Sequence, residues 1–179
     1  AFRRRFFRPL PEYAGDDCLI PLDVTEQDGR CLSVAEAQST DLWASEAGSE
    51  FSARIRMTQR NMTGTLMYPG LLNPVGRPLV AWSLFSHKIL RWLTPYFVIG
   101  ALAANALLLD EGFYVVTFIV AFAGLAVSTL GLAGQFLGIR IPVAGALGSL
   151  LVVNLGFFIG VLKSASGRKV YAYGRKKTP

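Results

Sequence analysis

The distribution of apolar residues divides the chain into a polar N-terminal half and a largely apolar C-terminal half. Within residues 93–162, only two short polar segments interrupt the apolar sequence. A helix needs roughly 20 apolar residues to cross a bilayer core of ~30 Å. The pattern therefore predicts a water-facing head followed by two to three transmembrane helices. Their expected bounds are about 93–109, which is short for a span, 113–137 and 143–162.

In the head, the pattern predicts two helices. Residues 18–27 carry an apolar stripe at helical spacing, and Asp16 and Asp17 are suited to the first turn of such a helix. Residues 50–66 predict a second, basic helix. The end of a strand or a loop is expected at 1–8, a short strand at 31–35 and a loop at 40–48.

A linker and an amphipathic helix are expected between head and membrane, within residues 69–92. Two prolines and a glycine in 71–78 indicate the linker. From 79 to 92, aromatic and aliphatic residues share one helical face and cations another, as in a helix lying at the membrane surface. The alternative is that this segment is simply the start of the first span. The expected membrane-interface residues are Trp82, His87, Lys88, Arg91 and Trp92.

The charges favour a membrane partner. The formal net charge is +6, and basic residues cluster at 3–8, at 54–60 and in the tail, 164–179. Cations beside apolar spans typically meet anionic headgroups, so we expect membrane lipids as partners and no nucleic acid. Lys88 and Arg91 favour a cytoplasmic head. Three full crossings would then place the basic tail outside, so either the first stretch does not cross or the tail departs from the rule.

Small and polar residues in the apolar stretches predict helix packing. Gly156 with Gly160, and Gly124 with Ser128, have the spacing that permits close helix contact. Hydrogen bonds between helices are expected from Asn105, Gln135 and Asn154, and the alternative is that these residues line a substrate path. Cys18 and Cys31 are expected to be reduced thiols, because two cysteines make no disulfide framework or metal motif.

Two groups of residues are candidates for catalysis or ligand binding. Adjacent carboxylates at Asp16 and Asp17 resist joint ionisation, which suits a general base, although capping of the helix is the alternative. Arg56 and Arg60 are four residues apart on one helical face and would together hold a phosphate. The alternative for them is a basic face over lipid headgroups.

Residues 1–11, 15–22 and 29–30 together resemble the last third of the catalytic domain of a bacterial family-2 glycosyltransferase. Residues 72–95, with Ser86-His87-Lys88 and Arg91-Trp92, resemble the segment that joins this domain to C-terminal membrane helices in cellulose-synthase-like and hyaluronan-synthase-like members. The resemblance implies an α/β fold for residues 1–68, as the C-terminal part of a GT-A domain, followed by the interfacial helix and a transmembrane bundle.

The resemblance also implies an inverting sugar transfer from a nucleotide sugar to a lipid-linked or saccharide acceptor. Asp17 matches the general base of the family, and Asp16 matches the acid beside it. Arg56 matches the arginine near the donor diphosphate, and Arg60 would assist it. The location implied is the bacterial inner membrane, with several crossings and a cytoplasmic head.

The chain departs from the family pattern at several points. Ala53 and Met57 replace the glutamine and tryptophan of the motif around Arg56, which favours a non-processive enzyme. The resemblance implies a divalent metal, Mg or Mn, but its Asp-x-Asp ligand motif does not occur here. We therefore expect a fragment that is inactive alone. The alternative functions are a non-catalytic membrane scaffold or assembly subunit, and a small transporter component, which the sparse polar content of the spans disfavours.

Overall fold

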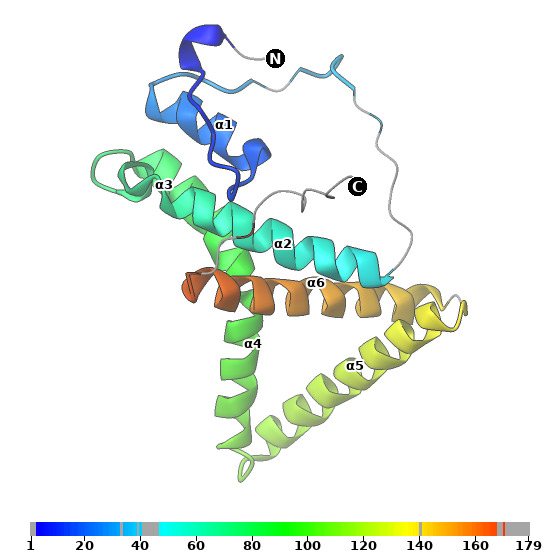
Figure 1. Ribbon diagram of the computed structural model, residues 1–179. Helices are drawn as coiled ribbons and strands as arrows, with labels where there is room; N and C mark the ends of the chain where they lie inside the picture. Colours follow the sequence, from blue (N-terminus) through cyan, green and yellow to red (C-terminus); the bar gives the residue numbers. More distant parts are fainter. Residues whose placement is uncertain are drawn as a thin grey trace. The chain divides into compact units, whose positions relative to one another are not determined.

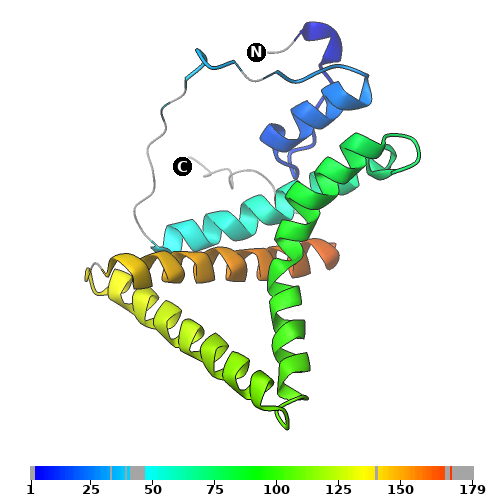
Figure 2. The ribbon, with the colours of Figure 1, turned by 180° about the vertical axis from the view of Figure 1, so that it is seen from behind.

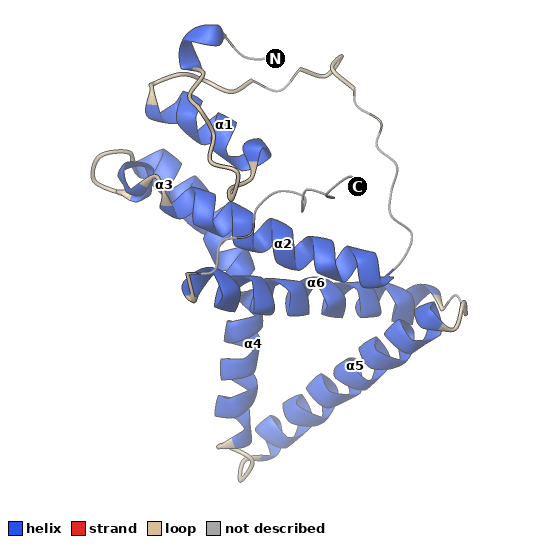
Figure 3. Ribbon diagram, viewed as in Figure 1, coloured by secondary structure: helices blue, strands red, loops and turns tan. Residues whose placement is uncertain are grey.

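The computed structural model describes residues 3–32, 34–38, 40, 47–139, 141–167 and 170. Every regular element in these residues is helical, and no strand occurs among them (Figures 1 and 3). Short 3-10 turns, η1 and η2, cover Arg4–Phe6 and Pro69–Leu72, and a π-helical turn, η3, covers Phe85–Ile89. The α-helices are α1 (Asp16–Glu26), α2 (Ala47–Leu66), α3 (Pro78–Leu84), α4 (Leu90–Ala106), α5 (Gly112–Phe136) and α6 (Pro142–Ala165).

The expected α/β fold of the head is wrong, because its described residues contain helices and turns instead of a sheet. Residues 4–6 form a 3-10 turn, in which the Phe6 N–H donates to the Arg3 carbonyl at 3.0 Å. In the segment 31–35, described except for Ser33, no strand forms. A strand needs a partner strand for its backbone groups, and the rest of the described head is helical or irregular. The predicted loop at 40–48 lies mostly outside the described residues.

Helix α1 confirms the predicted first helix of the head. Gly15 precedes it in extended conformation, and Asp16 and Asp17 occupy the first turn, where carboxylates interact favourably with the helix dipole. The helix ends at Glu26, and Asp28, with a φ of 57°, then reverses the chain so that the Gly29 N–H donates to the Val24 carbonyl. Buried apolar residues fix the inner face of this helix: Cys18, Leu19, Leu22 and Val24.

The predicted interfacial helix and first span form one continuous helix, Pro78–Ala106, of 29 residues (Figure 2). Pro78 starts it because a proline at the first helical position loses no hydrogen bond. The π-helical turn at Phe85–Ile89 inserts one residue and shifts the register of the faces on either side. The helix ends at Ala106, three residues before the predicted end of the span.

Three helices are long and apolar enough to cross a membrane, which confirms the expected transmembrane character. They are Pro78–Ala106, Gly112–Phe136 and Pro142–Ala165. Large apolar side chains project from α5 into the surroundings, with Phe113 72% and Leu130 65% exposed. Such surface is stable in lipid and costly in water.

The chain divides into two compact units. One comprises residues 1–43, 56–91 and 160–179, and the other comprises 44–55 and 92–159. In the second unit, α5 and α6 approach most closely at glycines. A side chain at Gly131 would overlap the backbone of Ala144, and one at Gly148 would overlap the backbone of Leu132. The sequence-predicted pair of Gly124 and Ser128 makes no such contact, since Gly124 faces open space.

Polar side chains join the helices of the second unit, as predicted for two of three residues. Gln135 donates to the Gly145 carbonyl and to Ser149 Oγ, at 2.8 and 3.2 Å, linking α5 to α6. Asn105 on α4 donates to Thr117 Oγ1 on α5 at 2.6 Å. Asn154 instead donates to the Leu150 carbonyl of its own helix.

Replacing Gly131 by alanine should separate α5 from α6, because its methyl group would overlap the Ala144 backbone. We expect a loss of about 1–3 kcal/mol of stability, the usual cost of overpacking, measured by thermal unfolding in detergent. The matched control is Gly124→Ala on the same helix, where the methyl group meets open space. Equal unfolding temperatures for both variants would contradict this packing.

Candidate functional site

A cavity within the first unit runs along α1, from its first turn to the segment that follows the helix. Its volume is about 1150 Å³, and it is open to solvent. Asp16 and Asp17 line it, together with apolar residues of α1 and residues of the segment that follows. Both carboxylates are exposed. The structure thus places the predicted carboxylate pair at a space large enough for a saccharide.

Gly15 lets the Asp17 carboxylate fold back over the start of the helix. A Cβ atom at Gly15 would lie 2.5 Å from Asp17 Oδ1 and 2.6 Å from Asn61 Oδ1. Both oxygens therefore occupy the space that a side chain at this position would need. Any larger residue at position 15 would displace them, so the Gly-Asp-Asp order has a steric reason here. Asn61, on α2, was not predicted from the sequence.

The two predicted phosphate-binding arginines lie apart from this cavity. Arg56 is exposed on α2, and neither Arg56 nor Arg60 lines the cavity. The Arg60 guanidinium donates to the Ala14 carbonyl at 2.7 Å. Since Ala14 is buried directly before Gly15, this hydrogen bond ties the segment that leads into α1 to α2. Arg60 therefore positions the carboxylate segment.

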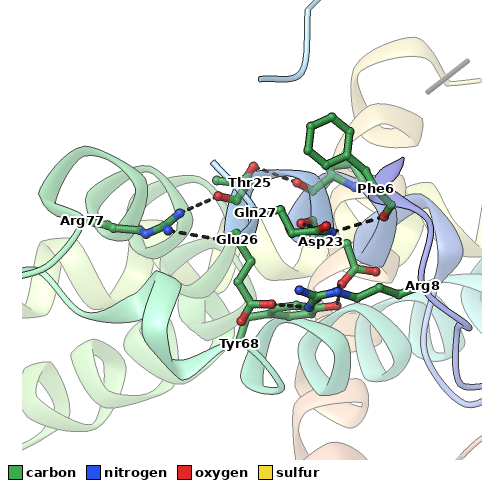
Figure 4. Close-up of polar contacts among 9 residues, drawn as sticks. Phe6, Arg8, Asp23, Thr25, Glu26, Gln27, Tyr68 and Arg77 are labelled. Carbon is green, nitrogen blue, oxygen red and sulfur yellow. Dashed lines mark hydrogen bonds and ion pairs between the residues drawn. The ribbon is translucent and has the colours of Figure 1, made fainter. Parts of the chain in front are cut away.

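A third arginine holds the other end of α1 (Figure 4). Arg77 donates to the carbonyls of Thr25 and Glu26 and forms an ion pair with Asp28 at 2.8 Å. These carbonyls lie at the C-terminus of the helix, where they have no partner within the helix and where a cation interacts favourably with the dipole. Arg77 thus caps α1 from outside.

A buried carboxylate fixes the middle of α1 to the chain beyond α2. Asp23 is only 4% exposed, and Tyr68 Oη donates to its Oδ1 at 2.7 Å. Arg8 lies 3.6 Å from the same oxygen and also pairs with Glu26 (Figure 4). Burial raises the pKa of Tyr68 well above its ordinary value, and the hydrogen bond to Asp23 raises it further. The tyrosine is therefore a neutral donor.

The predicted membrane-interface residues have different environments. Trp82 is 69% exposed, and His87 and Arg91 are also exposed, whereas Trp92 is buried. Lys88 turns inward, and its ammonium lies 3.2 Å from Cys18 Sγ on α1. Cys18 directly follows Asp17, so this contact joins η3 to the helix that carries the candidate base. Neither described cysteine is in a disulfide.

The residues present do not fit the divalent metal that the resemblance implies. Among the described residues, no three His, Cys, Asp or Glu side chains come together as metal ligands.

Several positioning residues left no signal in the sequence. Asn61, Tyr68 and Arg77 act on α1 from distances of more than 40 residues along the chain. Arg77 lies between Gly76 and Pro78, a setting that predicts a cation in a loop. Neither neighbour indicates that its side chain caps the C-terminal end of α1. Asp23 is recognisable only in part, as an acid on the apolar stripe of α1.

Comparison of the chain with protein-family models, curated proteins and solved structures finds no match. The resemblance to family-2 glycosyltransferases therefore remains a prediction from the motifs in the sequence.

Replacing Tyr68 by phenylalanine should destabilise the chain near neutral pH, because the buried Asp23 carboxylate loses its closest donor. We expect a cost of about 1–3 kcal/mol. The raised pKa of Tyr68 stabilises the fold fully below the ordinary value of 10 and progressively less above it. The difference in unfolding temperature between wild type and Y68F should therefore shrink between pH 8 and pH values above 10. A constant difference would contradict the role of this hydroxyl.

Proposed function

We propose that this chain is part of a membrane-bound enzyme that transfers a sugar from a nucleotide sugar to a membrane-associated or saccharide acceptor. Asp17 is the general base that activates the acceptor hydroxyl, and Asp16 beside it tunes or orients that carboxylate. The observation that carries the proposal is the position of Asp17, which is exposed and lines a cavity of about 1150 Å³.

The contrast between Asp17 and Asp23 on the same helix supports this assignment. Asp23 is buried, bonded to Tyr68 and close to Arg8, so its carboxylate serves the fold. Asp17 faces the cavity, and among the described residues it has no ion-pair partner. A base must reach its substrate and must not be neutralised by a fixed cation, so the exposure of Asp17 and its lack of an ion pair among the described residues support this role.

The proposed step is an in-line displacement at the anomeric carbon of the donor sugar. The acceptor oxygen gives its proton to the Asp17 carboxylate as it forms the new bond to that carbon. The bond from the anomeric carbon to the diphosphate oxygen breaks, and its electron pair leaves with the nucleoside diphosphate. Configuration at the anomeric carbon is therefore inverted.

The membrane helices support an acceptor that is bound to, or emerges from, the lipid surface. The helix that begins at Pro78 and continues into a candidate span carries Lys88, which contacts the residue after Asp17. The same continuous helix thus links the first unit, which holds the carboxylates, to an apolar segment suited to lipid. Trp82 and His87, exposed in the first three turns of this helix, are suited to headgroup depth.

The proposal predicts that Asp17→Asn abolishes sugar transfer in the complete protein, because asparagine cannot accept the proton. We expect the transfer rate to fall by about 10²–10⁴-fold, the usual contribution of a general base, with donor binding retained. The measurement is transfer of radiolabelled sugar in membranes that contain the complete protein. Glu12→Gln is the matched control, since Glu12 is an exposed acid of the same segment that does not line the cavity.

Transfer at the wild-type rate by Asp17→Asn would contradict the proposal. It would favour the alternative of a non-catalytic membrane scaffold or assembly subunit, in which the carboxylates only begin a helix. Loss of transfer in the Glu12→Gln control would point to general damage and would also count against Asp17 as the base.

A further inference from the structure

Two sets of arginines in the unit that contains the cavity differ in what their guanidinium groups contact. The first set donates to carboxylates or backbone carbonyls and holds α1 in place: Arg8, Arg60 and Arg77. The second set lines the cavity: Arg3, Arg5 and Arg30. Within the described part of the chain, no carboxylate lies within ion-pairing distance of the second set. None of these three guanidinium groups has an ion pair in the described residues, and Arg5 makes only a cation–π contact, 4.8 Å from the centroid of the Phe6 ring.

The charges around the cavity leave an excess of cations. Three carboxylates also line it, those of Asp16, Asp17 and Asp28. Asp28 is neutralised by Arg77, at 2.8 Å, and Arg77 is not part of the lining. Three guanidinium groups therefore remain against two carboxylates. The two carboxylates are adjacent at the start of α1 and form an acidic part of the cavity. The three arginines give the rest of the lining a net positive charge.

The chemistry of the lining matches a ligand with a phosphate group. Guanidinium groups bind phosphate oxygens through paired, charge-assisted hydrogen bonds, and arginine is preferred for such anions. The rest of the lining includes apolar side chains of α1 and of the following segment, among them Ile20, Val24 and Leu32. The volume of about 1150 Å³ exceeds that of most small-ligand pockets. A phosphate ester of a saccharide fits this combination of charge, apolar surface and size.

We infer that the cavity binds a phosphate-bearing saccharide acceptor, with its phosphate on Arg3, Arg5 and Arg30 and its hydroxyl at Asp17. The position of the hydroxyl rests on the function proposed for Asp17, whereas the phosphate site rests on the three arginines alone. The phosphate belongs either to a lipid-linked saccharide or to a water-soluble sugar phosphate, and the two share the same recognition chemistry.

The test is equilibrium binding to the 179-residue chain in nanodiscs of neutral phosphatidylcholine. The probes are a hexose 1-phosphate, a farnesyl-diphosphate-linked hexose and, as the uncharged comparison, a methyl hexoside. We expect a phosphate probe to bind at least about tenfold more weakly to Arg30→Ala and to Arg3→Ala/Arg5→Ala, as loss of charged hydrogen bonds predicts. Arg4→Ala is the matched control, because Arg4 belongs to the same turn but does not line the cavity.

Binding of the farnesyl-linked probe alone would support the inference with a lipid-linked acceptor, and binding of both phosphate probes would support it with a soluble one. Equal weakening by Arg4→Ala, equal binding of the uncharged hexoside, or wild-type affinity in all arginine variants would overturn it. Circular dichroism of each variant verifies that the helices remain formed.

Asp17→Asn separates this inference from the proposed function. It removes a negative charge beside the phosphate, so binding should be unchanged or tighter. Loss of phosphate binding in this variant would overturn the assignment of the phosphate to the arginines. If Asp17→Asn instead retains both binding and sugar transfer, the proposed function fails while the phosphate site stands.

Discussion

The attachment of α1 by cationic side chains is the constraint on which the candidate site depends. At its N-terminal end, Arg60 donates to the Ala14 carbonyl, and at its C-terminal end Arg77 donates to two terminal carbonyls. Between them, Tyr68 donates to the buried Asp23. The helix has only 11 residues, too few to be stable alone in water. Its position, and that of Asp17, is therefore determined by side chains from distant parts of the chain.

Different forces stabilise the helices that are suited to the membrane. In apolar surroundings, helix contact gains no free energy from the hydrophobic effect. Helix association there depends on close packing at small residues and on hydrogen bonds between helices. The contact of α5 with α6 at Gly131 and Gly148, with Gln135 donating across it, has both features. In the head, by contrast, buried apolar residues such as Leu19 and Leu71 supply most of the favourable free energy.

The sequence predicted the features that depend on long or local patterns. The three apolar helices follow from hydropathy, and the start of α1 follows from the preference of acids such as Asp16 and Asp17 for a first helical turn, although Gly15 is the N-cap and no side chain caps the helix. The α/β fold was wrong because it came from the resemblance, and a short apolar run such as 31–35 forms a strand only beside another strand. The inward position of Lys88 was not predicted. Helical periodicity indicates which face of the helix carries this residue, but it does not indicate that Cys18 lies opposite that face. The predicted phosphate role of Arg60 did not anticipate its contact with Ala14.

The measurement that tests this account most directly is hydrogen–deuterium exchange of the α1 amides in a chain with Arg60→Gln and Arg77→Gln. Exchange reports local opening of a helix, and both substitutions remove the guanidinium group while leaving a shorter, polar side chain. The account predicts that amides 18–26, apart from proline 21, exchange faster than in the wild type, while those of α5 are unchanged. Unchanged exchange throughout α1 would show that these arginines do not hold the helix, and would contradict the account.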